Sequence, residues 1–225
     1  MLSNLIKKAI LMYKYRYNRH RARAINFAFD FCRHNHVDGD YFEFGVYRGD
    51  TFKYAFHLAE LKENKSMNFF AFDSFAGFSE PSGNDDIGII KKGGRSCSEQ
   101  DFLKIIKSDG VDLKRVKILP GWFEQTLEGA GKLETDKKIG AAKAAIIYID
   151  CDLYEPAILS LDFITNKLVD GSIILFDNWF LFKGSPYRGE RKAFTEWLEK
   201  NHNFVASEFH KFGWHGSSFI INHKL

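Results

Sequence analysis

The sequence contains few cysteines and few prolines. Of its 225 residues, three are cysteine and four are proline. The cysteines Cys32, Cys97 and Cys151 lie far apart and form no C-x-x-C pair, which argues against a disulfide framework and against a cysteine zinc site. We therefore expect a protein of a reducing, cytoplasmic compartment.

Long hydrophobic runs are also missing. No stretch of about 18 apolar residues occurs, so no membrane-spanning helix is expected. The first residues lack the apolar core and small-residue cleavage site of a secretory signal. The net charge of +3 is too small to indicate a nucleic-acid partner, and no interleaved basic and aromatic pattern supports one.

Acidic residues are absent from residues 1–24, which carry seven lysines and arginines among apolar residues. Such a basic amphipathic helix can touch an anionic membrane surface as a peripheral contact. It can also pack on its own domain or on a sister subunit, and we favour this interpretation. We expect residues 1–36 to form a helical extension, residues 37–225 to form the main domain, and the protein to be a homo-oligomer.

Short apolar runs recur along the rest of the chain, separated by segments long enough for a helix. The runs cover residues 41–46, 67–73, 115–121, 145–151 and 172–178. Continuous apolar runs of this length are typical of parallel strands that are buried on both faces. Helices are expected over about 50–64, 155–168 and 190–201, and the tail 203–223 reads as two extended runs around a glycine-containing turn. The pattern predicts a doubly wound α/β sheet with a C-terminal antiparallel hairpin, in which ligands bind beyond the carboxyl ends of the strands.

The first apolar run leads into Glu43-x-Gly45-x-x-x-Gly49. Glycines allow a sharp turn and a close approach to a ligand, and the following helix presents unpaired N–H groups. The spacing is wider than the G-x-G-x-x-G of a dinucleotide site, and an acid precedes the first glycine. That carboxylate suits an ammonium group better than a pyrophosphate, although a plain strand–helix corner explains the motif equally well.

Asp73 ends the second run, a position that suits hydrogen bonds to a ribose diol. The alternative interpretation is that its side chain caps a local turn.

Polar side chains also follow two later runs. Asp150 and Asp152 come after one, and Asp177 and Asn178 come after the next. The ends of adjacent parallel strands lie about 5 Å apart, so these oxygens are expected to converge. Carboxylate and amide oxygens suit Mg²⁺, Mn²⁺ or Ca²⁺. The competing interpretation is that the acids cap a helix and open a turn.

Six motifs in order carry a resemblance to a known family. They are EFGVYRG, FDSFAGFSEP, KKGGRSCSEQDF, GWFEQTL, IDCDLYEPA and LFDNW. Together they resemble the macrocin-type O-methyltransferases over about residues 40–200. These are class I S-adenosylmethionine-dependent enzymes, many of which methylate sugar hydroxyls in natural products or surface glycans. The resemblance implies a mostly parallel, Rossmann-like methyltransferase sheet.

The resemblance also implies a cofactor site at the ends of three strands. The residues implied are Glu43, Gly45, Val46, Gly49 and Thr51 at the methionine end, Asp73 with Ser74 at the ribose, and Gly121 with Trp122 at the adenine.

The catalytic and metal residues implied by the resemblance come from the acid cluster. Asp150, Asp177 and Asn178 would hold Mg²⁺ or another divalent cation, and Asp152 would act as general base, although Asp150 and Asp152 could exchange roles. Asn178 departs from the family, in which a second Asp is usual at this position.

The resemblance places a mobile lid over residues 83–98, where Gly83, Gly88, Gly93 and Gly94 lie. The aromatic loop 179–189 is expected to form part of the acceptor pocket, with simple packing as the alternative.

The function implied is metal-assisted O-methyl transfer to a hydroxyl of a sugar or a glycosylated small molecule. A catechol-like phenol acceptor, and a non-catalytic S-adenosylmethionine-binding assembly protein, stay open as alternatives. The sequence does not identify the acceptor.

Overall fold

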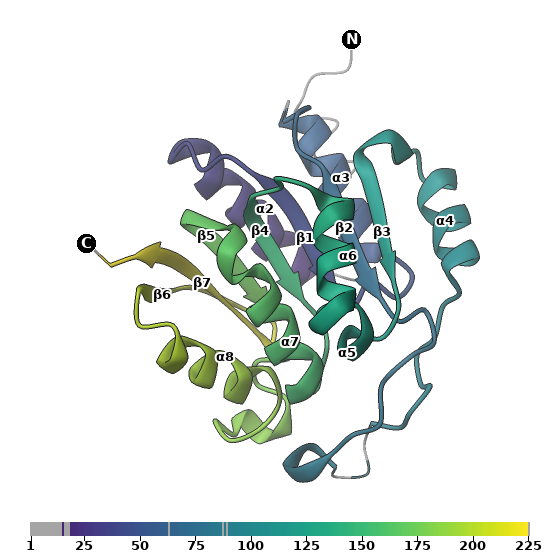
Figure 1. Cartoon of the computed structure of the whole chain (residues 1–225). Helices are drawn as coiled ribbons and strands as arrows, with labels where there is room; N and C mark the ends of the chain where they lie inside the picture. The colour runs from purple at the N-terminus through teal and green to yellow at the C-terminus, as the bar shows by residue number, and fades with distance from the viewer. Residues whose placement is uncertain (1–14, 16–18, 63, 87, 89, 225) are drawn as a thin grey trace.

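The computed structural model describes residues 15, 19–62, 64–86, 88 and 90–224 (Figure 1). Over these residues the chain forms a seven-stranded sheet with helices on both faces. The strands are β1 (Asp40–Phe44), β2 (Phe69–Asp73), β3 (Val116–Pro120), β4 (Ala144–Ile149), β5 (Leu168–Phe176), β6 (Phe204–Phe212) and β7 (Gly216–His223). The α-helices are α2 (Arg19–His34), α3 (Asp50–Leu61), α4 (Glu99–Ser108), α5 (Phe123–Thr126), α6 (Gly129–Ile139), α7 (Tyr154–Ile164) and α8 (Gly189–Lys200).

The strand order is β3-β2-β1-β4-β5-β7-β6. The first five strands of the chain pair in parallel, and β7 joins β5 antiparallel, with β6 at the edge. This arrangement confirms the predicted doubly wound sheet with a C-terminal antiparallel hairpin. The order reverses between β1 and β4, so the region beyond the carboxyl ends of these two strands is where such a fold binds ligands.

The centre of the sheet is buried on both faces, which explains the continuous apolar runs of the sequence. On one face Phe42 stacks on Phe70, and Phe44 stacks on Phe72, with ring centroids 4.6 and 4.4 Å apart. Residues of α5, α6, α7 and α8 pack on this face. Residues of α2, α3 and α4 pack on the other face. Parallel strands held rigidly in this way fix the positions of the side chains at their ends.

Helix α2 is the described part of the predicted N-terminal extension. Its apolar side, with Ala24, Ile25 and Ala28, is almost completely buried against the core. The basic residues before it lie outside the described residues, and of residues 1–18 the structure describes Tyr15 alone. The predicted boundary between residues 36 and 37 stays a prediction.

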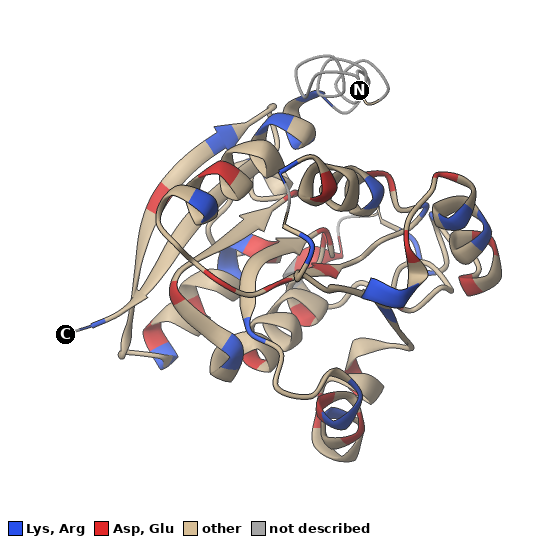
Figure 2. Ribbon diagram, turned by 90° about the horizontal axis from the view of Figure 1, so that it is seen from above, with Lys and Arg blue, Asp and Glu red and all other residues tan. Residues whose placement is uncertain are grey.

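The charges of the described chain are mixed rather than gathered by sign. In Figure 2 acidic and basic residues alternate over the helices and loops. None of the helices among the described residues combines the length and the apolar character needed to cross a membrane.

The turn between β1 and α3 passes directly over the end of β4. Gly45 has a φ of 87°, and its N–H donates to the carbonyl of Phe72 at 2.8 Å. A Cβ atom at this position would lie 2.2 Å from the carbonyl oxygen of Asp150. Both the backbone conformation and the available space therefore require glycine here.

The first prediction compares Gly45→Ala with Gly110→Ala. Gly110 has a similar φ of 84°, but a Cβ atom there would meet no neighbour within 4 Å. Both variants lose stability through the unfavourable backbone conformation, by about 1–2 kcal/mol. We expect Gly45→Ala to lose at least about 2 kcal/mol more, because overpacking displaces the end of β4. Chemical denaturation of both variants measures the difference, and equal losses would contradict the close crossing.

Candidate active site

A cavity of about 410 Å³ lies beyond the carboxyl ends of the central strands. Its volume falls in the range of about 300–1,000 Å³ that small-molecule sites occupy. Eight of the residues expected from the sequence line it: Gly45, Val46, Thr51, Asp73, Ser74, Trp122, Asp150 and Asp152. The other expected residues, which lie around the cavity without lining it, are Glu43, Gly49, Gly121, Asp177 and Asn178. The structure therefore brings six of the nine predicted cofactor residues, together with Asp150 and Asp152, to one cavity.

Asp73 fastens the turn on this cavity wall. One of its carboxylate oxygens accepts the backbone N–H groups of Val46 and Tyr47 at 2.8 and 3.0 Å. The other oxygen accepts the N–H of Phe75 at 2.7 Å. This is the turn-capping role that the sequence left open. The ribose contact stays a prediction.

Glu43 lies behind the cavity wall and is fully buried. It accepts hydrogen bonds from the hydroxyls of Tyr41 and Thr51, each at 2.6 Å. Burial raises the pKa of Glu43 to about 8, and the two hydroxyl donors oppose that rise. Thr51 therefore separates Glu43 from the cavity, and the expected contact with an ammonium group stays a prediction.

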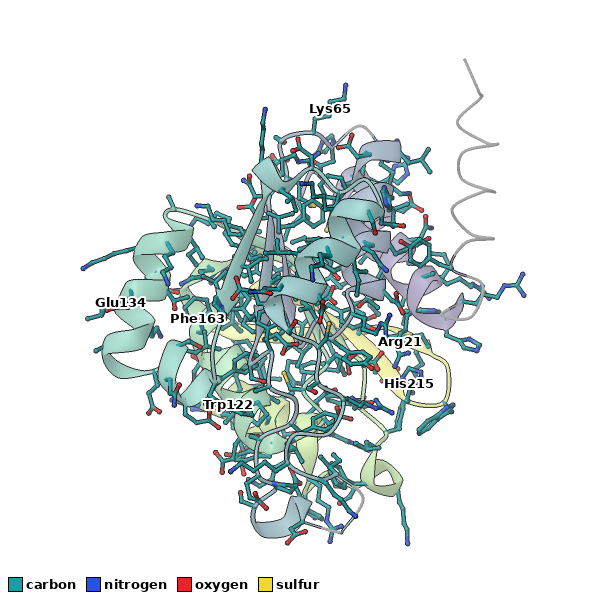
Figure 3. All side chains as sticks on the ribbon, turned by 90° about the vertical axis from the view of Figure 1, so that its right-hand side faces the viewer. Arg21, Lys65, Trp122, Glu134, Phe163 and His215 are labelled. Atoms are coloured by element: carbon teal, nitrogen blue, oxygen red, sulfur yellow. The ribbon has the colours of Figure 1, made fainter. Side chains whose placement is uncertain are left out.

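Asp177, at the end of β5, is fully buried and paired with an arginine. Arg21 of α2 donates from Nε to Oδ1 at 2.7 Å and from Nη2 to Oδ2 at 2.5 Å. The hydroxyl of Tyr148 donates to Oδ1 at 2.5 Å. His215 donates from Nδ1 to the carbonyl oxygen of Asp177 at 2.6 Å, and Figure 3 shows Arg21 and His215 side by side. Both carboxylate oxygens of Asp177 are thus engaged by the protein.

Asp150 and Asn178 contact each other across the ends of β4 and β5. The amide nitrogen of Asn178 donates to Oδ1 of Asp150 at 3.1 Å. Burial, followed by the nearby charges of Asp177 and Asp152, raises the pKa of Asp150 well above its ordinary value. The Glu190 side chain of α8 holds the two strand ends together, because it accepts the backbone N–H groups of Cys151 and Asn178 at 3.2 and 2.8 Å.

Asp152 is held in a tight, strained turn on the cavity wall. Its φ is 60°, and the N–H of Leu153 donates to the carbonyl of Cys151 at 2.6 Å, across Asp152. A non-glycine residue in this conformation costs about 1–3 kcal/mol, and such strain is concentrated at functional sites. Burial raises the pKa of Asp152 to about 6, and the charge of Arg95 opposes the rise. A carboxylate of this pKa can accept a proton near neutral pH.

The acid cluster does not fit a divalent cation as it stands in this structure. Of the three predicted ligands, Asp177 accepts hydrogen bonds from Arg21 and Tyr148 with its two carboxylate oxygens. Asn178 directs its amide nitrogen, and not its oxygen, toward Asp150. A cation needs accessible oxygen lone pairs at about 2.0–2.6 Å. Among the described residues no group of three or more His, Cys, Asp or Glu side chains has the geometry of a metal site.

The segment predicted as a lid contributes to the cavity and is fixed at its tip. Arg95 of the segment lines the cavity, and so does Phe78, which precedes the segment. Asp85, at its tip, is buried and accepts the N–H of Tyr154 at 2.6 Å and the N–H of Gly189 at 3.0 Å. These N–H groups belong to the first residues of α7 and α8, where a carboxylate is favoured. In Figure 1 the segment extends away from the sheet on this side.

Two aromatic residues of the loop 179–189 pack in the core. Trp179 is buried and lies 4.7 Å from Phe219 by ring centroids. Phe182 is buried, whereas Tyr187 is 73% exposed. Among the described residues that line the cavity, none belongs to this loop. The packing alternative accounts for Trp179 and Phe182, and the contribution of this loop to an acceptor pocket stays a prediction.

Three residues that matter to the site were missed by the sequence reasoning: Arg21, Asp85 and Glu190. Each lies outside the strand ends, and each reaches its partner across a long stretch of chain. The absence of acids in residues 1–24 drew attention to the arginines there, but no pattern indicated that one of them pairs with Asp177.

The second prediction concerns the pH dependence of stability. Because the pKa of Glu43 is raised from 4.5 to about 8 on folding, the native state keeps a proton that the unfolded chain releases. Its stabilising contribution is complete below about pH 4.5 and is lost as pH rises toward 8, by up to about 1.4 kcal/mol per pH unit. Glu43→Gln stays neutral, so the variant should gain stability relative to the wild type as pH rises. Urea denaturation at several pH values measures this difference.

The control for this experiment is Glu199→Gln, which changes an exposed residue of α8. It should leave the pH dependence unchanged. If the free energy of unfolding depends on pH in the same way for Glu43→Gln and the wild type, Glu43 does not keep its proton in the folded protein.

Comparisons with known proteins agree with this geometry. The family model for macrocin O-methyltransferase (TylF) matches residues 16–217. A Streptomyces olivaceus protein, 8-demethyl-8-(2,3-dimethoxy-alpha-L-rhamnosyl)-tetracenomycin-C 4'-O-methyltransferase, is 25% identical over 151 residues. That match covers 64% of this chain and 54% of the relative, so the chain spans about half of that protein's length.

Two solved structures share the fold. The O-methyltransferase NovP has a TM-score of 0.73 at 20% identity, over 92% of this chain and 81% of its own. The calicheamicin methyltransferase CalS11 has a TM-score of 0.71 at 22% identity, over 88% of this chain and 77% of its own. Because the family model covers most of the sequence, the chain belongs to the macrocin O-methyltransferase family.

Proposed function

We propose that this chain transfers a methyl group from S-adenosylmethionine to a hydroxyl of a sugar or a glycosylated small molecule. The observation that carries the proposal is the single cavity in which a glycine turn, Asp73 and Trp122 face the same space as Asp150 and Asp152. Family membership supports the cofactor, and the rhamnosyl acceptor in the name of the Streptomyces olivaceus relative supports a glycosylated acceptor.

The cofactor binds along the cavity wall formed by the ends of β1, β2 and β3. Val46 and Thr51 lie at the methionine end, Asp73 and Ser74 at the ribose, and Trp122 beside the adenine. Glu43 acts from behind Thr51, through the hydroxyl that joins them. Gly45 and Gly49 give the turn its shape, and Gly121 does the same after β3.

Asp152 acts as the general base. The acceptor oxygen attacks the methyl carbon, the carbon–sulfur bond breaks as the oxygen–carbon bond forms, and S-adenosylhomocysteine leaves. The hydroxyl proton passes to Asp152, whose pKa of about 6 leaves it mostly ionised at pH 7. Placement of the two reactants in one cavity supplies a further part of the rate, about 7–11 kcal/mol in well-oriented cases.

The expected metal has no step in this mechanism. A divalent cation at Asp150, Asp177 and Asn178 would polarise the acceptor hydroxyl. The hydrogen bonds that already occupy these side chains argue against that arrangement.

The segment 83–98 acts as a lid over the bound ligands. Asp85 fastens the lid to the first residues of α7 and α8, Arg95 of the lid lines the cavity, and Phe78, which precedes the lid, lines it too. Aromatic and arginine side chains at this entrance suit the face and the hydroxyls of a sugar ring.

The third prediction tests the function with Asp152→Asn. Wild-type protein should methylate members of a panel of glycosylated acceptors, measured by mass spectrometry with labelled S-adenosylmethionine. Asp152→Asn should lower turnover by about 10²–10⁴-fold, because it cannot accept a proton. Its affinity for S-adenosylhomocysteine, measured by calorimetry, should stay within about twofold, since the cofactor contacts are unchanged.

Asp150→Asn is the matched comparison. The methylation rate of the wild type should fall below about pH 6, where the general base becomes protonated. If this fall disappears in Asp150→Asn and persists in Asp152→Asn, the two acids exchange roles. Methylation of catechols but of no glycosylated acceptor would overturn the acceptor class, and cofactor binding without turnover on any acceptor would support the assembly protein.

The fourth prediction concerns the lid. Asp85→Ala leaves the N–H groups of Tyr154 and Gly189 without their carboxylate, which costs about 1.5–3 kcal/mol of local stability. We expect faster proteolysis within residues 83–98 and a higher KM for the acceptor. Asp86→Ala, at the exposed neighbouring position, should change neither. Equal proteolysis rates for the two variants would show that Asp85 does not hold the lid.

A further inference from the structure

We propose that the guanidinium of Arg21 takes the place of a divalent cation in the acid cluster, so that methyl transfer by this chain is independent of metal. The inference rests on the proposed function for the methyl transfer, whereas the contacts of the acid cluster do not depend on that function. Three acids, Asp150, Asp152 and Asp177, converge at the ends of β4 and β5, and like charges at this separation need a compensating positive charge. In this chain that charge comes from a side chain of α2.

The pairing of Asp177 leaves no place for a cation at its carboxylate. Oδ1 accepts two hydrogen bonds, from Nε of Arg21 and from the hydroxyl of Tyr148, and Oδ2 accepts a third from Nη2 of Arg21. This is the two-bond geometry in which a planar guanidinium matches a carboxylate. The Asp177 side chain is fully buried, so a cation would have to break these bonds and shed its own water to reach it.

Asn178 provides a second, independent observation. Its amide nitrogen donates to Asp150, whereas a metal ligand at this position would have to present an oxygen. An aspartate here would place another negative charge against Asp150. The asparagine instead supplies a donor, so Asp177 and Asp150 are each compensated by hydrogen-bond donors of the chain itself.

The position of Arg21 is fixed by the packing of its helix. Ala24, Ile25 and Ala28, within the next two turns of α2, are buried in the core. His215, from the turn between β6 and β7, lies against the backbone of Asp177 on the same side. The guanidinium is therefore held as part of the folded structure.

Arg21 also faces the place where the reaction occurs. Its side chain is 30% exposed, and it lines the cavity together with Asp150 and Asp152. A fixed positive charge beside an acceptor hydroxyl stabilises the negative charge that develops as the proton leaves. Arg21 thus combines two tasks that a metal would perform, since it neutralises Asp177 and favours the ionised acceptor.

The test measures Mn²⁺ binding by electron paramagnetic resonance, with Mn²⁺ as the only added ligand. The wild type and the Asp177→Asn variant should bind Mn²⁺ to the same extent, because Asp177 holds no Mn²⁺ in the wild type. Arg21→Ala/Asn178→Asp frees Asp177 and restores a carboxylate at position 178, so it should bind one Mn²⁺ at least tenfold more tightly than the wild type. Arg23→Ala/Asn178→Asp is the matched control, because Arg23 is an exposed residue of the same helix. It should show no such gain.

The wild-type measurements decide the inference even if the double variant fails to fold. Wild-type methyl transfer should be unchanged by EDTA, and Arg21→Lys, which keeps the charge, should retain more turnover than Arg21→Ala. Stoichiometric Mn²⁺ binding by the wild type that depends on Asp177 would overturn the proposal. A folded double variant, shown by S-adenosylhomocysteine binding, that gains no Mn²⁺ would also overturn it. Absence of turnover on every acceptor would instead count against the proposed function and leave the Mn²⁺ comparison decisive.

Discussion

The arrangement of this site depends on how buried carboxylates are compensated. Burying an ionised carboxylate without partners costs several kcal/mol, so each one must find donors or keep its proton. Four buried acids have donors from the chain: Glu43, Asp85, Asp177 and Glu190. Hydroxyls serve the first, backbone N–H groups serve the second and the last, and Arg21 serves Asp177. These contacts join β1 to α3, α2 to the end of β5, and the ends of β4 and β5 to α8, and they tie the segment around Asp85 to α7 and α8.

The buried carboxylates of the site differ in their surroundings and in their roles. Where backbone or guanidinium donors are supplied, the acid has a structural role, as Glu190 does when it joins the ends of β4 and β5. Burial raises the pKa of Asp150 and Asp152, and it also raises that of Glu190, where the two backbone donors oppose the rise. Asp152 also lies in a strained turn, and its pKa near 6 suits proton transfer close to neutral pH. The proposed function therefore gives proton transfer to Asp152, which combines a strained turn with a pKa close to neutrality.

The sequence predicted the sheet and the acids that line the cavity because both depend on local patterns. Apolar runs mark buried parallel strands, and parallel topology places Asp73, Asp150 and Asp152 at one edge. Contacts across the fold could not be predicted in this way. Arg21 meets Asp177 from 156 residues away in the chain, and nothing near either residue indicates the pairing. The two interpretations of the aromatic loop stayed open for a related reason, because composition cannot distinguish Trp179 in the core from an aromatic residue that lines a pocket.

Helix α2 lies in the predicted extension of residues 1–36. It packs on the core and carries Arg21 into the site. If Arg21 provides the positive charge of the acid cluster, then docking of α2 completes the electrostatics of the cavity. Loss of that docking would leave Asp177 buried without its partner, which is strongly destabilising for a carboxylate. The helix is then required both for the stability of the end of β5 and for the charge that faces the acceptor. The predicted boundary between residues 36 and 37 thus lies between Arg21 and the acid cluster whose charge it compensates.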